Sequence, residues 1–378
     1  MKIVIGGDIC ITSSALEHLE RHGVSSFNEL VSLNQGADIS IFNMECPATN
    51  SDEKILKIGP NHKTNILAVD YIRQLGFTHA SVANNHIWDF GKEGFVDTIN
   101  TLSKEGISVI GISKEKNVVT QNTNSGLRVG VISFADDEFY GNEEVYRSIN
   151  VFDPLESFDL VRETKQKCDY MIVLFHGGME NYRYPTPYLR RVCRKFIECG
   201  ADFVTCQHSH CVGCEEVYNG KHILYGQGNT YFYRKENTSN KWNCSILVVI
   251  NIDSEPDLKY EFIKTREDGG IEQIPKIDDE IASFLKRSKD IVNEDFVEKN
   301  FRKQCIDIKK TSNMMCFLTG KGIVSNFLNR ITNGAFFRIL FPNKKSIAMI
   351  NMIRCSVHRE VLEEIFNAKH YCGKKERR

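Results

Sequence analysis

The sequence predicts an α/β fold in which helices cover both faces of a largely parallel or mixed sheet. From Met1 to about Asp253, short apolar runs alternate with longer amphipathic stretches, a pattern typical of strands joined by helical crossovers. The chain has 378 residues, of which 41% are hydrophobic, enough for one large domain or two ordinary ones. In such folds the polar residues just after a strand matter most, because ligand sites collect at strand ends.

The predicted strands are short runs dominated by Val, Ile, Leu, Phe or Tyr, and longer amphipathic segments between several of them predict helices. In the helical segment 187–199, Leu189, Val192 and Phe196 share one face, which predicts packing against the sheet. The predicted strands cover residues 2–5, 38–43, 79–82, 108–111, 128–134, 170–175, 203–206, 222–225 and 245–252. The predicted helices between them cover residues 66–75, 91–105, 159–167 and 187–199.

The pattern changes near Glu255, where Pro and Gly residues interrupt the alternation. We therefore predict one domain over residues 1–255 and a basic, mainly helical region over residues 256–378, with helices at 278–301, 322–340 and 346–368. Residues 301–378 contain 16 Lys and Arg against 5 Asp and Glu, so their net charge is +11. The first 300 residues carry 32 against 44, a net charge of −12. The basic region either contacts an anionic partner, such as a membrane surface, or docks on the acidic body.

Composition excludes several classes of protein. A net charge of −1 and only 8 prolines argue against a disordered chain and against a nucleic-acid-coating protein. No apolar run approaches the ~20 residues of a membrane span, and the first residues do not resemble a secretory signal. The 13 cysteines, an odd number, are typical of free thiols in a reducing compartment. We therefore expect a cytoplasmic protein, or one that also binds the membrane surface.

Five segments place metal-binding side chains at or just after predicted strands. If these strand ends meet at one edge, their carboxylates, amides and imidazoles form a single pocket. Such a set suits two divalent ions of Mn, Fe or Zn, which in dinuclear hydrolases activate water and stabilise charge during hydrolysis. A histidine that is not a ligand could then protonate a leaving oxygen. The segments are Gly6-Gly7-Asp8, Asn43-Met44-Glu45, Asn84-Asn85-His86-Ile87-Trp88-Asp89, His176-Gly177-Gly178-Met179-Glu180 and His208-Ser209-His210.

Each segment also has an ordinary structural interpretation. Asp8 and Glu45 could be surface carboxylates, and His176 a hydrogen-bonded core residue. Asn84 and Asn85 could form a turn, since Asn tolerates left-handed backbone. The cysteines at 206, 211 and 214 could hold zinc, although such a site needs a further ligand pair. We prefer metal ligation for the strand-end residues because five such segments occur together.

The order of these motifs, followed by Tyr225-Gly226-Gln227-Gly228-Asn229, resembles the poly-γ-glutamate capsule biosynthesis (CapA) family. The resemblance covers roughly residues 1–250 and implies a calcineurin-like metallophosphatase fold, a four-layer α/β/β/α sandwich, followed here by the helical extension. It also implies that Glu45 bridges two metals, that His86 is the catalytic acid, and that Asn43, Asn84 and Asn229 contact the substrate. The implied metal ligands are Asp8, Glu45, Asn85, His176, His208 and His210.

Three positions depart from the metallophosphatase pattern. Cys10 stands where a histidine is usual, Glu45 replaces a bridging aspartate, and Gln207 replaces a glycine before the paired histidines. We expect Cys10 to be either a further ligand or a spectator. Asp89 and Glu180 match acidic positions of the family, where they would bind metal, orient its ligands or contact substrate.

The leading hypothesis is a metal-dependent hydrolase of a phosphoester, or alternatively an amide, in capsular or cell-envelope polymer biosynthesis. Its expected partner is an anionic or phosphorylated substrate. The alternative is a non-catalytic accessory subunit, which the basic C-terminal region would recruit to a membrane surface or polymer synthase.

Overall fold

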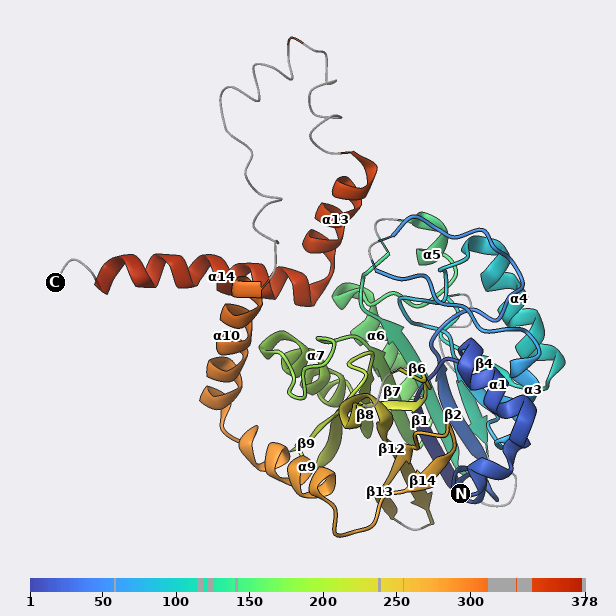
Figure 1. The fold of residues 1–378 in the computed structure, drawn as a ribbon. Helices are drawn as coiled ribbons and strands as arrows, with labels where there is room; N and C mark the ends of the chain where they lie inside the picture. The colour runs from blue at the N-terminus through green and yellow to red at the C-terminus, as the bar shows by residue number, and fades with distance from the viewer. Residues whose placement is uncertain are drawn as a thin grey trace.

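The structure is a computed structural model that describes residues 1–57, 59–113, 118–121, 126–139, 142–236, 239–253, 255–311, 331 and 342–375 (Figure 1). Its centre consists of two sheets packed face to face. The first sheet contains, in spatial order, β14 (Ile271–Gln273), β13 (Pro256–Thr265), β12 (Cys244–Ile252), β1 (Lys2–Ile9), β2 (Ile39–Met44), β3 (His79–Ser81) and β4 (Ser108–Ile110), with β11 (Asn229–Tyr231) paired to the end of β1.

The second sheet consists mainly of parallel strands, with an antiparallel strand at each edge. In it β6, β7, β8 and β10 run in the same direction, and β5 and β9 pair antiparallel to their neighbours. The spatial order is β5 (Val118–Gln121), β6 (Arg128–Ala135), β7 (Tyr170–His176), β8 (Phe203–Gln207), β10 (Lys221–Gln227) and β9 (Val212–Tyr218).

Helices cover the outer face of each sheet. Side chains alternate between the two faces of a strand, so Ile3 and Ile5 of β1 pack between the sheets whereas Val4 packs under the helices of the first sheet. The helices over the first sheet are α1 (Ser13–His22), α2 (Asn28–Asn34), α3 (Ala68–Gln74) and α4 (Gly91–Lys104), with the short 3-10 helix Gly23–Phe27. The second sheet is covered by α6 (Pro154–Lys165) and α7 (Pro187–Glu198). The predicted four-layer α/β/β/α sandwich is therefore confirmed.

The C-terminal part is helical but begins later than predicted. The boundary expected at residues 255 and 256 falls at a hairpin, because β13 pairs with β12 from Pro256 to Lys264 and adds a strand to the first sheet. Pro256 begins its strand, a position where the missing N–H costs little. The helices that follow are α9 (Asp279–Asp290), α10 (Glu294–Thr311), α13 (Asn343–Arg354) and α14 (Ser356–Lys375). The helix predicted at 322–340 lies, apart from residue 331, outside the described residues.

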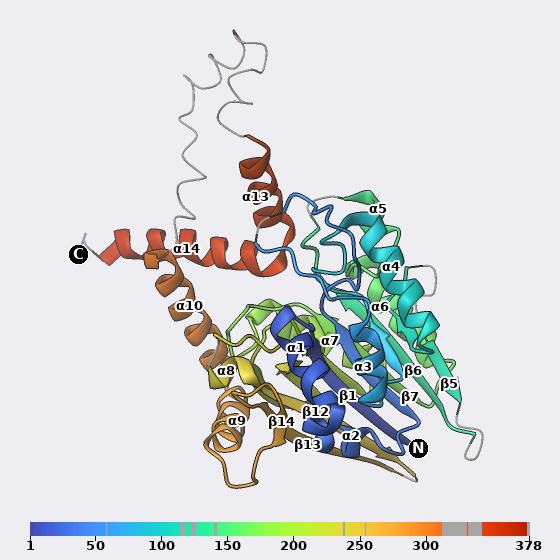
Figure 2. The same cartoon turned by 45° about the vertical axis from the view of Figure 1, so that its right-hand side comes forward.

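Helices α13 and α14 lie at the opposite end of the molecule from the N-terminus in both views (Figure 1, Figure 2). Two short helices, α5 (Glu143–Tyr146) and α8 (Asn240–Asn243), lie in connecting segments. Within the described residues, no helix has the combination of length and apolar character that a membrane span requires.

Candidate metal centre

The strand ends of the two sheets meet at one edge, as the sequence predicted. Asp8 pairs with Asn43 of the neighbouring strand in the first sheet, and His176 pairs with Gln207 in the second. The pairing sets the ends of β1 and β2 level with each other in one sheet, and the ends of β7 and β8 level in the other. The polar residues that follow these strands therefore face one another across the sandwich.

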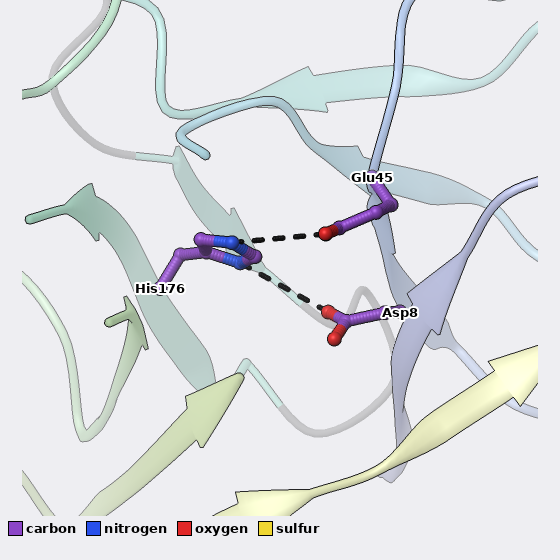
Figure 3. Close-up of side chains that lie close together, drawn as sticks. All are labelled: Asp8, Glu45 and His176. Atoms are coloured by element: carbon purple, nitrogen blue, oxygen red, sulfur yellow. Dashed lines mark ion pairs between the residues drawn. The ribbon is translucent and has the colours of Figure 1, made fainter. Parts of the chain in front are cut away.

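Asp8, Glu45 and His176 form the centre of the site (Figure 3). The two carboxylates come from the first sheet and the imidazole from the second, and one ligand atom from each lies within 4.8 Å of the others. His176 Nδ1 is 3.9 Å from Asp8 Oδ1, and His176 Nε2 is 3.7 Å from Glu45 Oε2. All three residues are almost fully buried.

The other three predicted ligands surround this group. His210 Nδ1 lies 3.3 Å from Asp8 Oδ2, and His210 Nε2 lies 3.5 Å from Glu45 Oε1. His208 Nδ1 is 3.2 Å and Asn85 Oδ1 is 3.0 Å from His176 Nε2. The structure thus brings all six residues together.

The turn that carries His208 and His210 has an unusual backbone. Both residues have positive φ, 89° and 52°, which is uncommon for residues other than glycine and is concentrated at functional sites. Gln207, which stands where the family pattern has glycine, donates from its amide to Gly6 O at 3.0 Å and to Gln227 Oε1 at 3.1 Å. Its side chain therefore ties the turn to the end of β1.

A close backbone approach allows β11 to pair with β1 beside Asp8. A Cβ added to Gly7 would lie 2.1 Å from Gly228 O, so only glycine fits at this position. The Gly before Asp8 therefore lets the backbone of residues 228 and 229 approach the site.

The three asparagines predicted to contact substrate lie behind the site instead. Asn43 donates to Asp8 Oδ1 at 2.8 Å and to Glu45 Oε2 at 2.7 Å, so it offsets the repulsion between these carboxylates. Asn84 donates to Asn43 Oδ1 at 3.0 Å, and Asn229 Oδ1 lies 2.9 Å from His210 Nδ1. All three are buried: Asn43 and Asn229 turn toward the carboxylates and an imidazole, and Asn84 turns toward Asn43 and the backbone.

His86 lies at the edge of the group, next to Asp89. His86 Nδ1 is 2.7 Å from Asp89 Oδ2 and 3.2 Å from Lys57 Nζ. Lys57 Nζ is also 2.5 Å from Asp89 Oδ1, and both side chains are buried. Asp89 therefore orients His86, the predicted catalytic acid, rather than a predicted metal ligand. Burial, followed by the charge of Lys57, lowers the pKa of His86 well below its usual value.

Lys57 and His62 were not predicted from the sequence. His62 packs its ring 4.9 Å from that of His86, and burial lowers its pKa to about 4. Both residues belong to the long connection between β2 and α3, where no strand end or motif marks them.

The electrostatics of the carboxylates favour bound cations. Burial and the neighbouring Asp8 charge raise the pKa of Glu45 well above its usual value. Burial alone would also raise the pKa of Asp8, but hydrogen bonding to His210 and the charge of His176 lower it overall. Glu45 Oε1 is buried and has no hydrogen-bond partner among the described residues. An orphaned carboxylate oxygen is costly to bury, and a divalent ion would satisfy it.

The donor set fits divalent ions in kind as well. Two carboxylates, three imidazoles and one amide oxygen converge, and hard oxygens with imidazole nitrogens suit Mn, Fe or Zn. Burial lowers the pKa of His176 well below its usual value, which favours the neutral form that metal ligation requires.

A cavity of about 340 Å³ opens beside this centre. Asn85, His86 and His208 line it, and so does Glu180, which is exposed. Glu180 thus lies where a substrate would contact it. Glu138 also lines the cavity. No motif marks this residue in the sequence, since it follows β6 within an acidic run.

Cys10 packs away from the ligand atoms. Its sulfur is 2.9 Å from Cys46 Sγ, and both residues pack with Phe232. Among the described residues, the group of potential ligand atoms within 4.8 Å contains Asp8, Glu45 and His176 but not Cys10. The cysteines whose side chains the structure describes are all free and buried.

The sequence and the site together place the chain in a family. The model of the bacterial capsule synthesis protein PGA_cap matches residues 2–234, more than half of the chain. The chain therefore belongs to this family, in agreement with the predicted resemblance.

Two relatives with assigned names are similar to this chain. It is 27% identical over 239 residues to the PGA biosynthesis protein CapA of Bacillus subtilis (strain 168), covering 60% of this chain and 62% of the relative. It is 26% identical over 240 residues to the capsule biosynthesis protein CapA of Bacillus anthracis, covering 60% of this chain and 58% of the relative. The chain thus matches about three fifths of the length of these relatives.

Among solved structures, a hypothetical protein from Thermus thermophilus aligns with a TM-score of 0.45 and 15% identity. The alignment covers 73% of this chain and 100% of that protein. A TM-score this low has no bearing on function.

Proposed function

We propose that this chain is a metal-dependent hydrolase of a phosphoester that acts in capsular or cell-envelope polymer biosynthesis. The convergence of Asp8, Glu45 and His176 from two different sheets, with Glu45 Oε1 left without a hydrogen-bond partner among the described residues, carries the proposal. Family membership and the names of the two relatives support the link to capsule synthesis.

The residues would divide the work as follows. Asp8, Glu45, Asn85, His176, His208 and His210 would hold two divalent ions, which when bound supply a nucleophilic hydroxide and stabilise phosphoryl charge. Asn43 keeps the two carboxylates in place through its paired donations. Glu45 reaches toward both His176 and His210, the position expected of a bridging group.

His86 is the proposed proton donor to the leaving oxygen. Asp89 holds the ring through Nδ1, which leaves Nε2 to face the substrate. Because burial and Lys57 lower the pKa of His86 in the free site, the negative charge of a bound phosphoester has to restore its proton. Lys57 lines the cavity and is a second group that such an anion would contact.

The test combines metal analysis with turnover. Purified full-length chain is analysed for Mn, Fe and Zn per chain, and hydrolysis of bis(p-nitrophenyl) phosphate is measured with each metal. We expect about two ions per chain and turnover in at least one metal form, both lost in Asn85→Ala and His176→Ala. A metal content near zero under all loading conditions would refute the proposal.

Polymer output in cells separates catalysis from an accessory role. If His176→Ala loses its metal and polymer synthesis is unchanged, the hydrolase proposal fails. The chain would then be an accessory subunit, and the basic residues 301–378 would recruit it to a membrane surface or a polymer synthase.

A further inference from the structure

The cavity beside the metal centre has two walls of different origin. Asn85, His86 and His208 form the wall that follows the strand ends, and Asn351 and His358 belong to a second wall formed by α13 and α14. The family model ends at residue 234, so the second wall lies outside the region that the family match covers.

Buried contacts hold the second wall in place. The Ser356 hydroxyl donates to Asp136 Oδ2, and both residues are less than 10% exposed. Val357 and Val361 are buried in a cluster with Tyr182 and Phe301. The first turns of α14 are therefore packed as part of the fold.

Glu138 links this wall to the metal centre. Its Oε2 accepts a hydrogen bond from Asn85 Nδ2 at 2.9 Å, and its Oε1 accepts one from Cys355 Sγ at 3.3 Å. Oε1 also lies 3.7 Å from His208 Nε2. One carboxylate thus contacts two proposed metal ligands and the start of α14, which fixes the distance between the walls.

The second wall combines apolar side chains, among them Val357 and Val361, with the amide of Asn351 and the imidazole of His358. Asn351 Nδ2 lies 3.2 Å from His358 Nδ1, so the two side chains form a hydrogen-bonded pair. Asn351 Oδ1 has no hydrogen-bond partner among the described residues, and Asn351 is only 6% exposed. An amide and an imidazole can each donate and accept hydrogen bonds, so the pair is complementary to an amide group.

Charge on the second wall does not favour a polyanion. Among the described residues, no Lys or Arg of α13 or α14 lines the cavity. The lysine that does line it, Lys57, is paired with Asp89. A ligand with several negative charges would thus find no free Lys or Arg on the described part of this wall.

We infer that α13 and α14 form the specificity wall of the site, which binds the part of the substrate beyond the scissile phosphoester and selects a neutral, amide-bearing group. The inference rests on the proposed function. It goes beyond that function by naming the substrate class and by placing two selecting residues, Asn351 and His358, in the C-terminal helices.

The experiment compares two phosphate monoesters on the metal-loaded full-length chain. One is O-phospho-N-acetylserinamide, which carries two amides, and the other is an alkyl phosphate with the same number of non-hydrogen atoms. Phosphate release gives kcat/KM, and calorimetry with the non-hydrolysable phosphonate counterparts gives Kd. Asn351→Ala and His358→Ala are compared with Ile353→Ala, whose side chain on the same helix pair is 65% exposed in the parent chain.

We expect the parent chain and Ile353→Ala to prefer the amide-bearing ligand by about tenfold, the effect of one or two neutral hydrogen bonds. Asn351→Ala and His358→Ala should each reduce that preference about three- to fivefold, whereas Ile353→Ala should keep turnover and affinity for both ligands within twofold of the parent.

Hydrolysis and binding are measured separately, so failure of the hydrolase proposal can be distinguished from failure of the specificity wall. If bis(p-nitrophenyl) phosphate and both monoesters resist hydrolysis but the binding preference exists and falls in both variants, the specificity wall is supported and the hydrolase proposal fails. If the parent shows no preference in binding, or both variants retain it, the inference is overturned whether or not the esters are hydrolysed.

Discussion

The two walls of the cavity differ in how their residues reach the site. The strand-end wall adjoins Asp8, Glu45 and His176, which lie at or just after the ends of buried strands. Pairing within each sheet aligns these strand ends, and the packing of the two sheets brings His176 opposite the carboxylates. On the second wall, formed by α13 and α14 and called the helical wall below, Asn351 and His358 reach the cavity through long-range contacts. Cys355 contacts Glu138, 217 positions earlier in the chain, and Ser356 contacts Asp136, 220 positions earlier.

The two walls also differ in what they would contribute to the site, metal binding in one case and substrate selection in the other. Metal ligands must be held within tenths of an ångström, and strand ends fixed by a sheet provide that rigidity. A wall that contacts only the remote part of a substrate tolerates more variation in position than a metal ligand does. Chemistry and specificity would then be carried by separate parts of one chain.

The largest effect should follow removal of a strand-end ligand. Asp8→Ala or His176→Ala deletes one of three groups whose ligand atoms lie within 4.8 Å of one another, so metal affinity should fall by more than about 100-fold. Metal content after dialysis, measured by mass spectrometry, checks this. Asp52→Ala, which alters a side chain that is 95% exposed, should keep its metal. Full occupancy in the Asp8 and His176 variants would place the metal elsewhere.

A smaller loss of metal affinity should follow from substitution of Asn43, which lies behind the ligands. Asn43→Leu removes the hydrogen bonds to Asp8 and Glu45 without removing a ligand, so metal affinity should fall about 10- to 100-fold. Calorimetric titration with Mn²⁺ measures it, with the exposed Asn50→Leu as control. Unchanged affinity would show that the carboxylates hold their positions without Asn43.

The sequence predicted most of the strand-end wall for a physical reason. Polar residues directly after apolar runs, such as Glu45 after β2, mark the edge where parallel strands end. The prediction that Asn43 contacts the substrate was wrong, because the direction of a side chain at a strand end depends on the register of the neighbouring strand. Lys57 could not be found either, since its position depends on a long loop that returns to Asp89.

The helical wall shows more clearly what the sequence alone cannot predict. The sequence predicted one helix over residues 346–368, where the structure has α13 and α14 on either side of Cys355. Nothing local indicates that Ser356 meets Asp136 or that Cys355 meets Glu138. The end of the first domain was also misplaced, because the break near Glu255 is a hairpin turn between β12 and β13 rather than a linker. Long-range packing decides both features.

The contact between the walls should depend on pH through Asp136. Burial raises the pKa of this carboxyl to about 6, above its value in the unfolded chain. The folded chain therefore holds the Asp136 proton more tightly than the unfolded chain does. The stability that this protonation contributes is fully present at low pH and is lost as the pH rises through about 6. Between pH 4 and 7 the parent should lose about 2 kcal/mol relative to Asp136→Asn.

Unfolding by urea across that pH range measures the difference, taken against Asp136→Asn so that other titrating groups cancel. Asp159→Asn, a substitution of an exposed aspartate on α6, serves as the control and should follow the parent. A constant difference between the parent and Asp136→Asn would mean that Asp136 is solvated in solution and that α14 is not docked over it.

The smallest effect should come from the charged rim of the same contact. Arg354 lies 3.4 Å from Asp137, and their side chains are 42% and 23% exposed. Solvent-exposed ion pairs contribute about 0–1 kcal/mol and weaken with salt, so Arg354→Ala should cost less than about 1 kcal/mol, and less still in 0.5 M NaCl. Thermal unfolding at the two salt concentrations measures it, with Arg359→Ala as control. If Arg354→Ala instead lowers the free energy of unfolding as much as ionisation of Asp136 does, the exposed ion pair rather than the buried contacts holds the helical wall in place. High salt would then detach that wall, while the strand-end wall would keep its metals.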